Sequence, residues 1–293
     1  MSKELNITQE WDKVFPKSEQ VNHRKVTFPN RFGITLVADL YVPKEVSEEK
    51  LPAIAVSGPF GAVKEQSSGL YAQTMAERGF LTIAFDPSFT GESGGVPRYV
   101  ASPDINTEDF QAVVIDTRVK ATVVSTMYDM TRVTANGYFD AMDEDARYKM
   151  REELNAQRII DFKQGDYARA GGVVDPLPED APQFVKDYHA YYKTDRGYHV
   201  RSLNSNDGWN RTSGLSLMNA KLLHYIPEIR HAVLVIHGEK AHSRYFGEDA
   251  FNELKGDNKE LMIIPEASHT DLYDQTDIIP FEKMATFFEE NLV

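Results

Sequence analysis

Short runs of apolar residues alternate with amphipathic segments along most of the chain. The runs are rich in aliphatic and β-branched residues, have the length of buried strands, and occupy residues 53–57, 80–85, 119–125, 232–237 and 260–264. Helical spacing separates several of them, as in 67–79, and a last amphipathic helix is predicted at 280–292. This alternation predicts an α/β fold with a mostly parallel sheet covered by helices on both faces, and we expect all five runs in that one sheet.

The chain outside these runs has a different pattern. Residues 23–29 and 33–43 look like strands on either side of the turn signal "NRFG", which predicts an antiparallel entry to the sheet. Residues 130–225 contain no buried-strand run, and their charged stretch "DAMDEDARYKMREELNAQRIIDF" has helical spacing. We therefore expect an N-terminal half of the core over 1–129, a helical cap or insertion over 130–225, and a C-terminal half of the core over 226–293.

Composition and charge narrow the classes of function. The 293 residues carry a formal net charge of −13 with Lys and Arg scattered, which argues against nucleic acid or a membrane surface as a partner. The chain has no cysteine, which excludes disulfides, thiolate metal sites and a cysteine nucleophile in it. The N-terminal residues lack an apolar signal core, and no apolar run is long enough to span a bilayer. We expect a soluble, cytoplasmic protein and leave homo-oligomerisation open.

The stretch "DPSFTGESGGVPR" contains the pattern G-x-S-x-G at Gly91, Ser93 and Gly95. In esterases this pattern marks a nucleophile on a sharp turn between a strand and a helix. Here the preceding strand ends several residues upstream, and Pro97 follows where the helix should begin. We therefore predict that Ser93 is a loop residue and not a nucleophile.

Three stretches together resemble the α/β-hydrolase fold, and within it the dienelactone-hydrolase-like group. They are "AVSGPFGAVKE", "AFDPSFTGESGG", and "VLVIHGEKAHSRYFGEDAF" followed by "IIPEASHTDLYD". Their order extends the resemblance over nearly the whole chain. It implies hydrolysis of a small-molecule ester or related carbonyl compound by acyl transfer, with a Ser or Cys nucleophile, a His and an acid, and without cofactor or metal.

The strand and helix that form the nucleophile elbow of this group are missing from the sequence. The predicted helix over 107–114, with Thr107 as its N-cap, runs into the strand at 119–126 through Val114 and Asp116, where the resemblance places the elbow. Eight helical residues span only ~12 Å, which is short for a crossover beside strands of ~17–20 Å. We expect a sheet that is one strand–helix unit short, with the strand at 119–126 in the vacated central place.

The resemblance places the general base at His269, in the loop after the last buried strand. The alternative is a surface histidine. Ala241 occupies the position at which many relatives have the acid. Two carboxylates could replace it: Glu239, at the tip of the same strand, and Asp129, which follows the strand at 119–126, although either could be a solvated loop residue.

Other candidates support two functions of different class. The backbone N–H groups of Phe60 and Gly61 could form an oxyanion hole, or this loop could be an ordinary turn. Ser125 is a weaker candidate nucleophile because it lacks flanking glycines. Trp209 and tyrosines of the cap could line an apolar substrate pocket or only pack. The chain is then either a hydrolase or a catalytically inactive, ligand-binding relative without the elbow.

Overall fold

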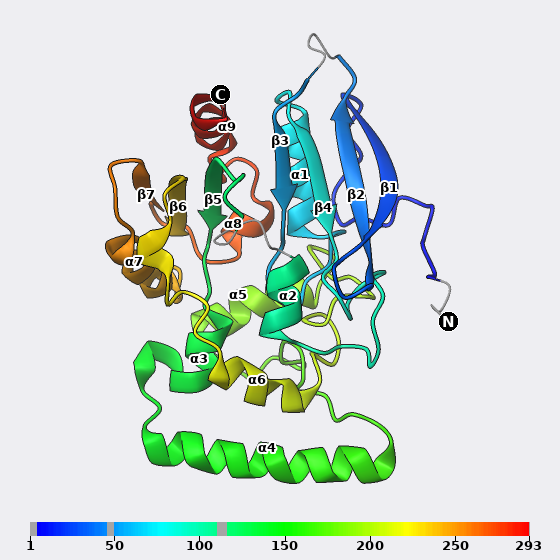
Figure 1. The fold of residues 1–293 in the computed structure, drawn as a ribbon, viewed down its shortest axis with the longest axis vertical. Coiled ribbons are helices and arrows are strands. Elements are labelled where there is room, and N and C mark those ends of the chain that lie inside the picture. The colour runs from blue at the N-terminus through cyan, green and yellow to red at the C-terminus, as the bar shows by residue number, and fades with distance from the viewer. Residues whose placement is uncertain (1–4, 46–49, 110–115, 293) are drawn as a thin grey trace.

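The computed structural model describes residues 5–45, 50–109 and 116–292 (Figure 1). The strands are Val21–Pro29 (β1), Thr35–Pro43 (β2), Ala53–Val56 (β3), Leu81–Phe85 (β4), Ala121–Ser125 (β5), Ala232–Gly238 (β6) and Lys259–Ile264 (β7). The α-helices are Ser67–Ala76 (α1), Pro103–Asp109 (α2), Met130–Asn136 (α3), Glu144–Gln164 (α4), Gln183–Tyr192 (α5), Gly214–Asn219 (α6), Arg244–Glu253 (α7), Asp271–Asp274 (α8) and Phe281–Asn291 (α9), with 3-10 turns at Tyr138–Asp140, Arg211–Ser213 and Ile226–Glu228. No helix in these ranges is long and apolar enough to cross a bilayer.

The predicted antiparallel entry is confirmed. β1 and β2 pair from Val21 opposite Pro43 to Pro29 opposite Thr35. The side chain of Asn30 shapes the turn, because its Oδ1 accepts hydrogen bonds from the backbone N–H groups of Phe32 and Ile34, at 3.0 Å each.

The strands form two sheets, so the expectation of one sheet is wrong. β1, β2, β4 and β3 make one sheet in that order, and β5, β6 and β7 make a second, parallel sheet. β5 pairs with β6 over five residues, from Ala121 opposite Ala232 to Ser125 opposite Ile236. Among the described residues no strand pairing joins β3 to β5. The strand at 119–126 therefore does not take a central place beside β3.

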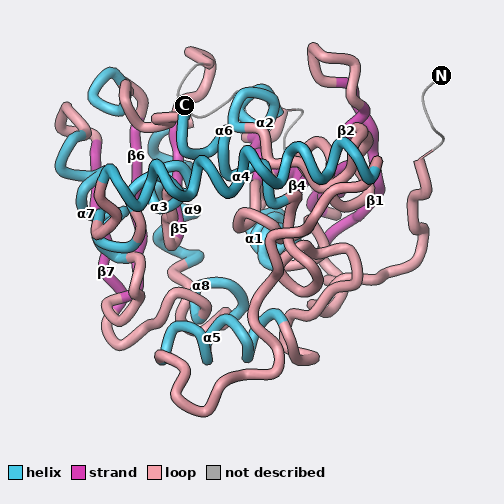
Figure 2. Tube along the Cα trace, turned by 90° about the horizontal axis from the view of Figure 1, so that it is seen from below, coloured by secondary structure: helices cyan, strands magenta, loops and turns pink. Residues whose placement is uncertain are grey.

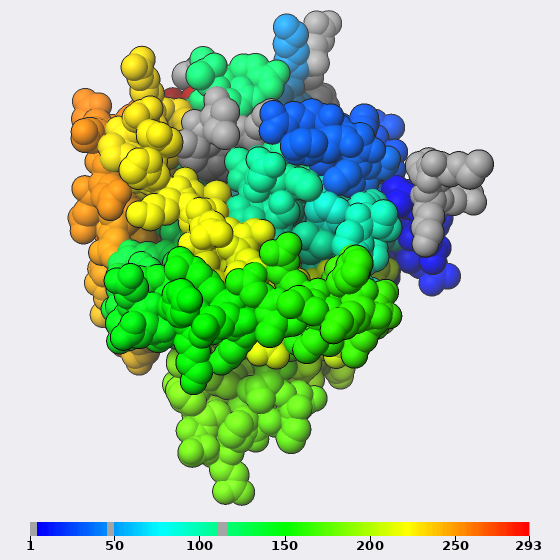
Figure 3. Space-filling view, turned by 60° about the horizontal axis from the view of Figure 1, so that its bottom comes forward, coloured from blue at the N-terminus to red at the C-terminus, as the bar shows by residue number. Residues whose placement is uncertain are grey.

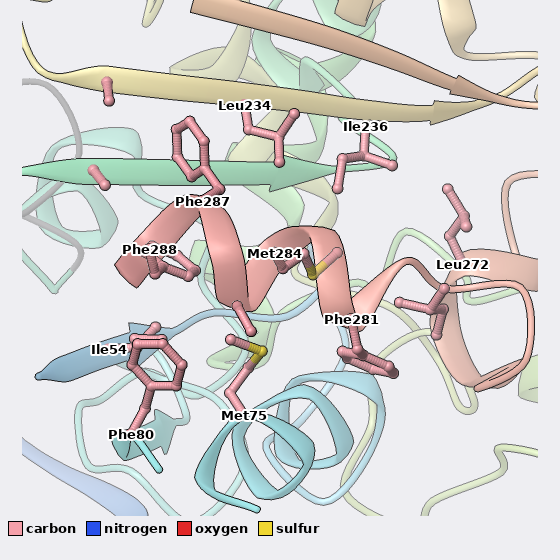
Figure 4. Close-up of a cluster of buried hydrophobic side chains, with 14 residues drawn as sticks. Ile54, Met75, Phe80, Leu234, Ile236, Leu272, Phe281, Met284, Phe287 and Phe288 are labelled. Atoms are coloured by element: carbon pink, nitrogen blue, oxygen red, sulfur yellow. The ribbon is translucent and has the colours of Figure 1, made fainter. Parts of the chain in front are cut away.

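Helix α9 gives a physical reason for the separation of the sheets. Its side chains lie in one buried cluster with Ile54 of β3 and with Leu234 and Ile236 of β6 (Figure 4). Phe288 packs against Phe80, with ring centroids 6.1 Å apart, and Phe287 lies on the side of the second sheet. Pairing β5 with β3 would bring them to the usual ~4.8 Å strand spacing, and this packed cluster would have to rearrange.

β3, which lies at the break between the two sheets, is less buried than an inner strand of a parallel sheet. All seven residues of β6 are buried. In β3, by contrast, Ile54 is buried but Ala53 and Ala55 are exposed. An inner strand of an α/β sheet is normally covered on both faces, so β3 behaves as an edge strand with one open face.

The region 130–225 forms a helical layer at the carboxyl ends of the parallel strands (Figure 1). Its described residues contain helices, turns and loops, with a single bridge between Arg169 and Asn210. Helix α4 crosses this end of the molecule (Figure 2), and the space-filling view shows it spread over the surface there (Figure 3). Asp143 caps its start, and Gly165, with φ 70°, ends it.

Helix α2 begins earlier than predicted. It covers Pro103–Asp109, so Thr107 lies inside the helix and is not its N-cap. Pro103 suits the first helical position because the N–H that it lacks has no intrahelical partner there. Residues 110–114 of the predicted helix lie outside the described residues, and with them Val114 at the junction where we expect the elbow to be missing.

Candidate active site

His269 lies in the loop between β7 and α8 and is only 3% exposed. It is therefore not a surface histidine. Both ring nitrogens have partners: Nδ1 is 2.5 Å from Oγ of Ser243, and Nε2 is 2.9 Å from the phenolic oxygen of Tyr273. The ring thus lies between a hydroxyl group that precedes α7 and a phenol on α8.

Aromatic rings surround this imidazole. Tyr128, Tyr188 and His242 have ring centroids 6.1, 5.3 and 5.5 Å from that of His269. Burial, together with the neighbouring His242 and His237, holds the pKa of His269 well below its ordinary value. The ring is therefore neutral near pH 7 and can accept a proton or a hydrogen bond.

The structure brings neither predicted acid to His269. Oε2 of the exposed Glu239 accepts a hydrogen bond from the backbone N–H of Glu266 at 3.0 Å. Asp129 caps helix α3, where its side chain accepts from the N–H groups of Thr131 and Arg132. An acidic residue directly before a helix is a strong N-cap, which explains this placement of Asp129. Their assignment as the acid stays a prediction.

Ser243, which does contact Nδ1, was missed by the sequence analysis. A serine directly before a helical pattern normally indicates an N-cap. Ser243 occupies the N-cap position of α7 but makes no side-chain capping hydrogen bond. Its hydroxyl bonds with His269 instead. The one sequence signal was its place two residues after Ala241, in the loop where the resemblance expects the acid.

Ser93 is a buried loop residue, as the sequence predicted. Its Oγ donates to the carbonyl of Asp86 at 2.6 Å and accepts from the N–H of Val37 at 2.8 Å. The hydroxyl proton is donated to Asp86, and the two hydrogen bonds connect the loop after β4 to β2.

Ser125 ends β5, and its hydroxyl lies 3.0 Å from the phenolic oxygen of Tyr71. Tyr71, on α1, donates its own proton to the carbonyl of Leu272 at 2.5 Å, so Ser125 is the donor to Tyr71. The next residue, Thr126, bonds to the backbone carbonyl of His269 at 3.3 Å. The structure thus brings Ser125 near the His269 loop but directs its hydroxyl to Tyr71.

The cap holds the loop that contains Phe60 and Gly61. Asn204 donates from Nδ2 to the carbonyl of Phe60 at 2.8 Å and from its backbone to that of Gly61 at 3.1 Å. The ring of Trp209 packs edge-on against Phe60, with centroids 4.9 Å apart. Trp209 therefore contacts this loop, and its role in lining a pocket stays a prediction.

These contacts leave the two candidate oxyanion donors free. In a planar trans peptide the N–H points opposite to the C=O, so the N–H of Gly61 points away from Asn204. Within the described part of the chain neither this N–H nor that of Phe60 has an acceptor. Gly61 has φ 83°, and a Cβ there would lie 2.3 Å from Oδ1 of Asn204, so glycine is favoured and any larger residue must displace the Asn204 side chain.

A buried ionic cluster supports the same loop. Nζ of Lys64 lies 2.6 Å from Glu65, 2.8 Å from Asp86 and 2.6 Å from Glu92, and all four side chains are completely buried. We call these four residues the Lys64 cluster. Burial alone would lower the pKa of Lys64, but the carboxylates raise it above its ordinary value. The three carboxylates could otherwise bind a metal ion, but the ammonium already occupies their centre.

Comparisons with known proteins agree with this fold. Residues 33–116 match the family described as X-Pro dipeptidyl-peptidase (S15 family). The Pseudomonas aeruginosa protein PA2218 is 53% identical over an alignment of 321 residues that takes in 99% of this chain and 86% of PA2218. Its crystal structure matches with a TM-score of 0.95 at 52% identity, covering 98% of this chain and 99% of that one. The alignment of 321 residues is longer than the 293-residue chain. Within the aligned region PA2218 therefore has residues that have no counterpart in this chain.

A more distant sequence match and a further solved structure were also found. The Escherichia coli protein YcjY is 28% identical over 310 residues, which cover 92% of this chain and 99% of YcjY. The α/β-hydrolase GrgF of a Penicillium species matches in structure with a TM-score of 0.72 at 15% identity, over 92% of this chain and 99% of that one. The chain thus has the α/β-hydrolase fold and belongs to the same protein family as PA2218.

Proposed function

We propose that the protein hydrolyses esters or related carbonyl compounds by acyl transfer, as in the dienelactone-hydrolase-like group that its motifs resemble. The observation that carries the proposal is the state of His269. It is a buried, neutral imidazole in the loop after the last strand, packed against aromatic rings at the carboxyl end of the second sheet. A neutral imidazole in this place is suited to general-base catalysis.

The roles in this reaction follow from the groups around the imidazole. His269 accepts the proton of an attacking hydroxyl, and the N–H groups of Phe60 and Gly61 bind the oxyanion that forms. The chain has no cysteine, so the attacking group is a serine. The rings of Tyr128 and Tyr188 would accommodate an apolar part of a small-molecule substrate. This chemistry needs neither cofactor nor metal.

A specific observation favours a second candidate, a ligand-binding protein without the acyl-transfer step. Nε2 of His269, the atom that should face a nucleophile, bonds to Tyr273, and burial with nearby tyrosines raises the pKa of that phenol well above its ordinary value. The break between β3 and β5, and the length of the alignment with PA2218, fit a chain that lacks the elbow. The hydroxyls of Ser93 and Ser125 have other partners.

Labelling with a fluorophosphonate probe tests the two candidates. Intact mass before and after exposure gives the stoichiometry, and hydrolysis of an activated aryl ester gives the rate. If the protein is a hydrolase, one serine is labelled, and His269→Ala lowers both labelling and hydrolysis by a factor of a thousand or more. If it is a ligand-binding protein, no serine is labelled, and the slow hydrolysis that remains does not depend on His269.

Three further variants serve as controls and identify the labelled serine. His224→Ala changes an exposed histidine and should leave labelling and rate unchanged. Ser93→Ala should change the rate by no more than a few fold, whereas loss of the label in Ser125→Ala would make Ser125 the nucleophile. Labelling that persists in His269→Ala would contradict the role proposed for His269.

A further inference from the structure

We propose that Ser243 is the positioning residue of His269, and that its hydroxyl group takes the place beside Nδ1 that a carboxylate takes in a catalytic triad. The proposal rests on the function proposed above, because it assumes that His269 is the working imidazole. It names a different residue type from the acid that the sequence analysis sought, and a different position from Glu239 and Asp129.

The geometry of Ser243 is fixed by the backbone around it. The residue is completely buried, and its carbonyl accepts the N–H of Phe246 at 3.0 Å in the first turn of α7. The N–H of Arg244 bonds to the carbonyl of Ala241 at 3.0 Å, which closes the turn before the helix. Both the start of α7 and the loop after β6 therefore hold Oγ at its distance of 2.5 Å from Nδ1.

No carboxylate competes for this contact within the described ranges. Asp271, the acid nearest to His269 in sequence, accepts from the N–H of Ser268 at 2.8 Å and lies 3.9 Å from Arg196. It therefore stabilises the local turn before α8. Ser243 is thus the hydrogen-bond partner that Nδ1 has.

The groups facing His269 on its other sides are all uncharged at neutral pH. They are His237 from β6, His242 from the loop after it, Tyr128 from the loop after β5, Tyr188 from α5, and Tyr273 from α8. None of them supplies a negative charge. A hydroxyl at Nδ1 can therefore orient the ring, but it cannot stabilise an imidazolium as a carboxylate does.

Ser243 can therefore orient the ring of His269 without supplying the negative charge of a triad carboxylate. With Nδ1–H donating to Ser243, Nε2 is left as an acceptor, which is the tautomer that a base or a ligand-binding imidazole needs. Because no carboxylate in the described part of the chain faces Nδ1, the ring stays neutral over the physiological pH range. The site is then suited to accept a hydrogen bond from a hydroxyl group, and it is a weaker base than a site with a carboxylate.

Nuclear magnetic resonance of the full-length protein tests this assignment without any turnover. The histidine signals are followed through a pH titration, and His269 is identified by the signal missing from His269→Gln. Ser243→Asp places a carboxylate at Nδ1 and should raise the pKa of His269 by about one unit or more, which is at least a tenfold tighter hold on the proton. Ser268→Asp, next to His269 in sequence, is the matched control and should have a smaller effect.

Two further variants keep the test decisive if Ser243→Asp does not fold. Ser243→Ala removes the partner of Nδ1, so the ¹⁵N signals of the two ring nitrogens should move toward a mixture of tautomers. Ser243→Thr keeps the hydroxyl and should restore the wild-type signals. Identical ¹⁵N signals in Ser243→Ala and the wild type would overturn the proposal, as would an unmoved pKa in a folded Ser243→Asp.

These readouts separate this proposal from the proposed function. If the ring signals respond to Ser243 but no serine is labelled by the fluorophosphonate, the positioning role holds and acyl transfer does not. If labelling depends on His269 but the ring signals ignore Ser243, acyl transfer holds and another group orients the ring.

Discussion

Nζ of Lys64 lies 2.8 Å from Oδ2 of Asp86, and both side chains are completely buried. This contact joins the loop after β3, which contains Phe60 and Gly61, to the loop after β4. Arg201 of the cap bonds to Glu65 of the same cluster at 2.8 Å, so the cap is linked to both loops. The Lys64 cluster therefore holds together the loop with the candidate oxyanion donors, the loop after β4 and the cap.

Replacement of Lys64 should destabilise the protein strongly. Lys64→Met leaves three buried carboxylates without their central cation, and removing one partner of a buried ion pair typically costs about 3–5 kcal/mol. Urea unfolding measures the loss. Lys240→Met is the control, because Lys240 forms an exposed, solvent-screened pair with Glu266 and its replacement should change the unfolding free energy far less. Equal effects of the two substitutions would contradict the importance of the cluster.

A divalent cation should partly replace the missing ammonium. In Lys64→Ala the carboxylate oxygens of Glu65, Asp86 and Glu92, which lie within 4.8 Å of one another, are left as a set of hard ligands of the kind that Ca²⁺ prefers. Excess CaCl₂ should raise the melting temperature of this variant by several degrees more than that of the wild type. An equal rise in melting temperature in both proteins, or no rise in the variant, would contradict the arrangement of the three carboxylates.

Acid should weaken the protein through His242. Burial, with a smaller effect of His237, lowers the pKa of His242 to about 4 in the folded state. Its unfolded pKa is about 6.5, so between these values the unfolded chain binds more protons, and stability falls as the pH falls. Both ring nitrogens of His242 are buried without a partner among the described residues, and the ring stacks on Phe184. His242→Phe should therefore be tolerated.

Urea unfolding of His242→Phe and the wild type between pH 7.5 and 4.5 measures this effect. The variant should show a flatter dependence on pH and should gain stability relative to the wild type below about pH 6.5. His224→Phe changes an exposed histidine and should leave the profile unchanged. Parallel profiles for His242→Phe and the wild type would show that His242 is not held neutral.

The local patterns predicted the elements well because their causes are local. The two-residue alternation of β1 and β2 and the Asn30 turn lie within one hairpin, and the strand runs of β4 to β7 are continuous in sequence. The neighbours of β5 depend instead on how α9 packs between distant strands, and no local period encodes that packing. The break in the sheet was therefore outside the reach of the sequence analysis.

The candidate site also contains residues that the sequence predicted and residues that it did not. His269 was predicted from the family resemblance together with its place after a strand. Ser243 has the sequence signature of a helix cap, but its hydroxyl bonds to the ring of His269 and makes no capping hydrogen bond. The members of the Lys64 cluster are spread from Lys64 to Glu92, and each alone resembles a solvated charge. Only the three-dimensional structure shows that they meet in the interior.

Gly61 and Gly33 form a matched pair for the loop held by Asn204. Both have positive φ, at 83° and 75°, but a Cβ on Gly61 would meet Asn204 at 2.3 Å, and one on Gly33 would meet nothing within 4 Å. Gly33→Ala should cost only backbone strain of about 1 kcal/mol. Gly61→Ala should cost about 1–3 kcal/mol more, because a buried contact must move.

A double-variant cycle assigns that difference to Asn204. In the background Asn204→Ala, the clash at Gly61 disappears, so the cost of Gly61→Ala should fall to that of Gly33→Ala in urea unfolding. An unchanged cost of Gly61→Ala in this background would mean that the loop does not contact Asn204 as the structure places it.

Hydrogen exchange should reveal the break between the two sheets. β4 is paired on both sides, with β2 and β3, whereas β3 pairs with β4 alone among the described strands and exposes Ala53 and Ala55. Amides on an unpaired edge with an open face exchange through small local openings, whereas amides in a strand paired on both sides need larger ones. Peptides over 53–56 should therefore exchange at least tenfold faster than those over 81–85. The comparison with β4 is decisive because both strands belong to the same sheet and share its global stability.

Peptides over 232–238, from the fully buried β6, should exchange slowest of all. Equal protection of β3 and β4 would mean that the free edge of β3 is covered in solution.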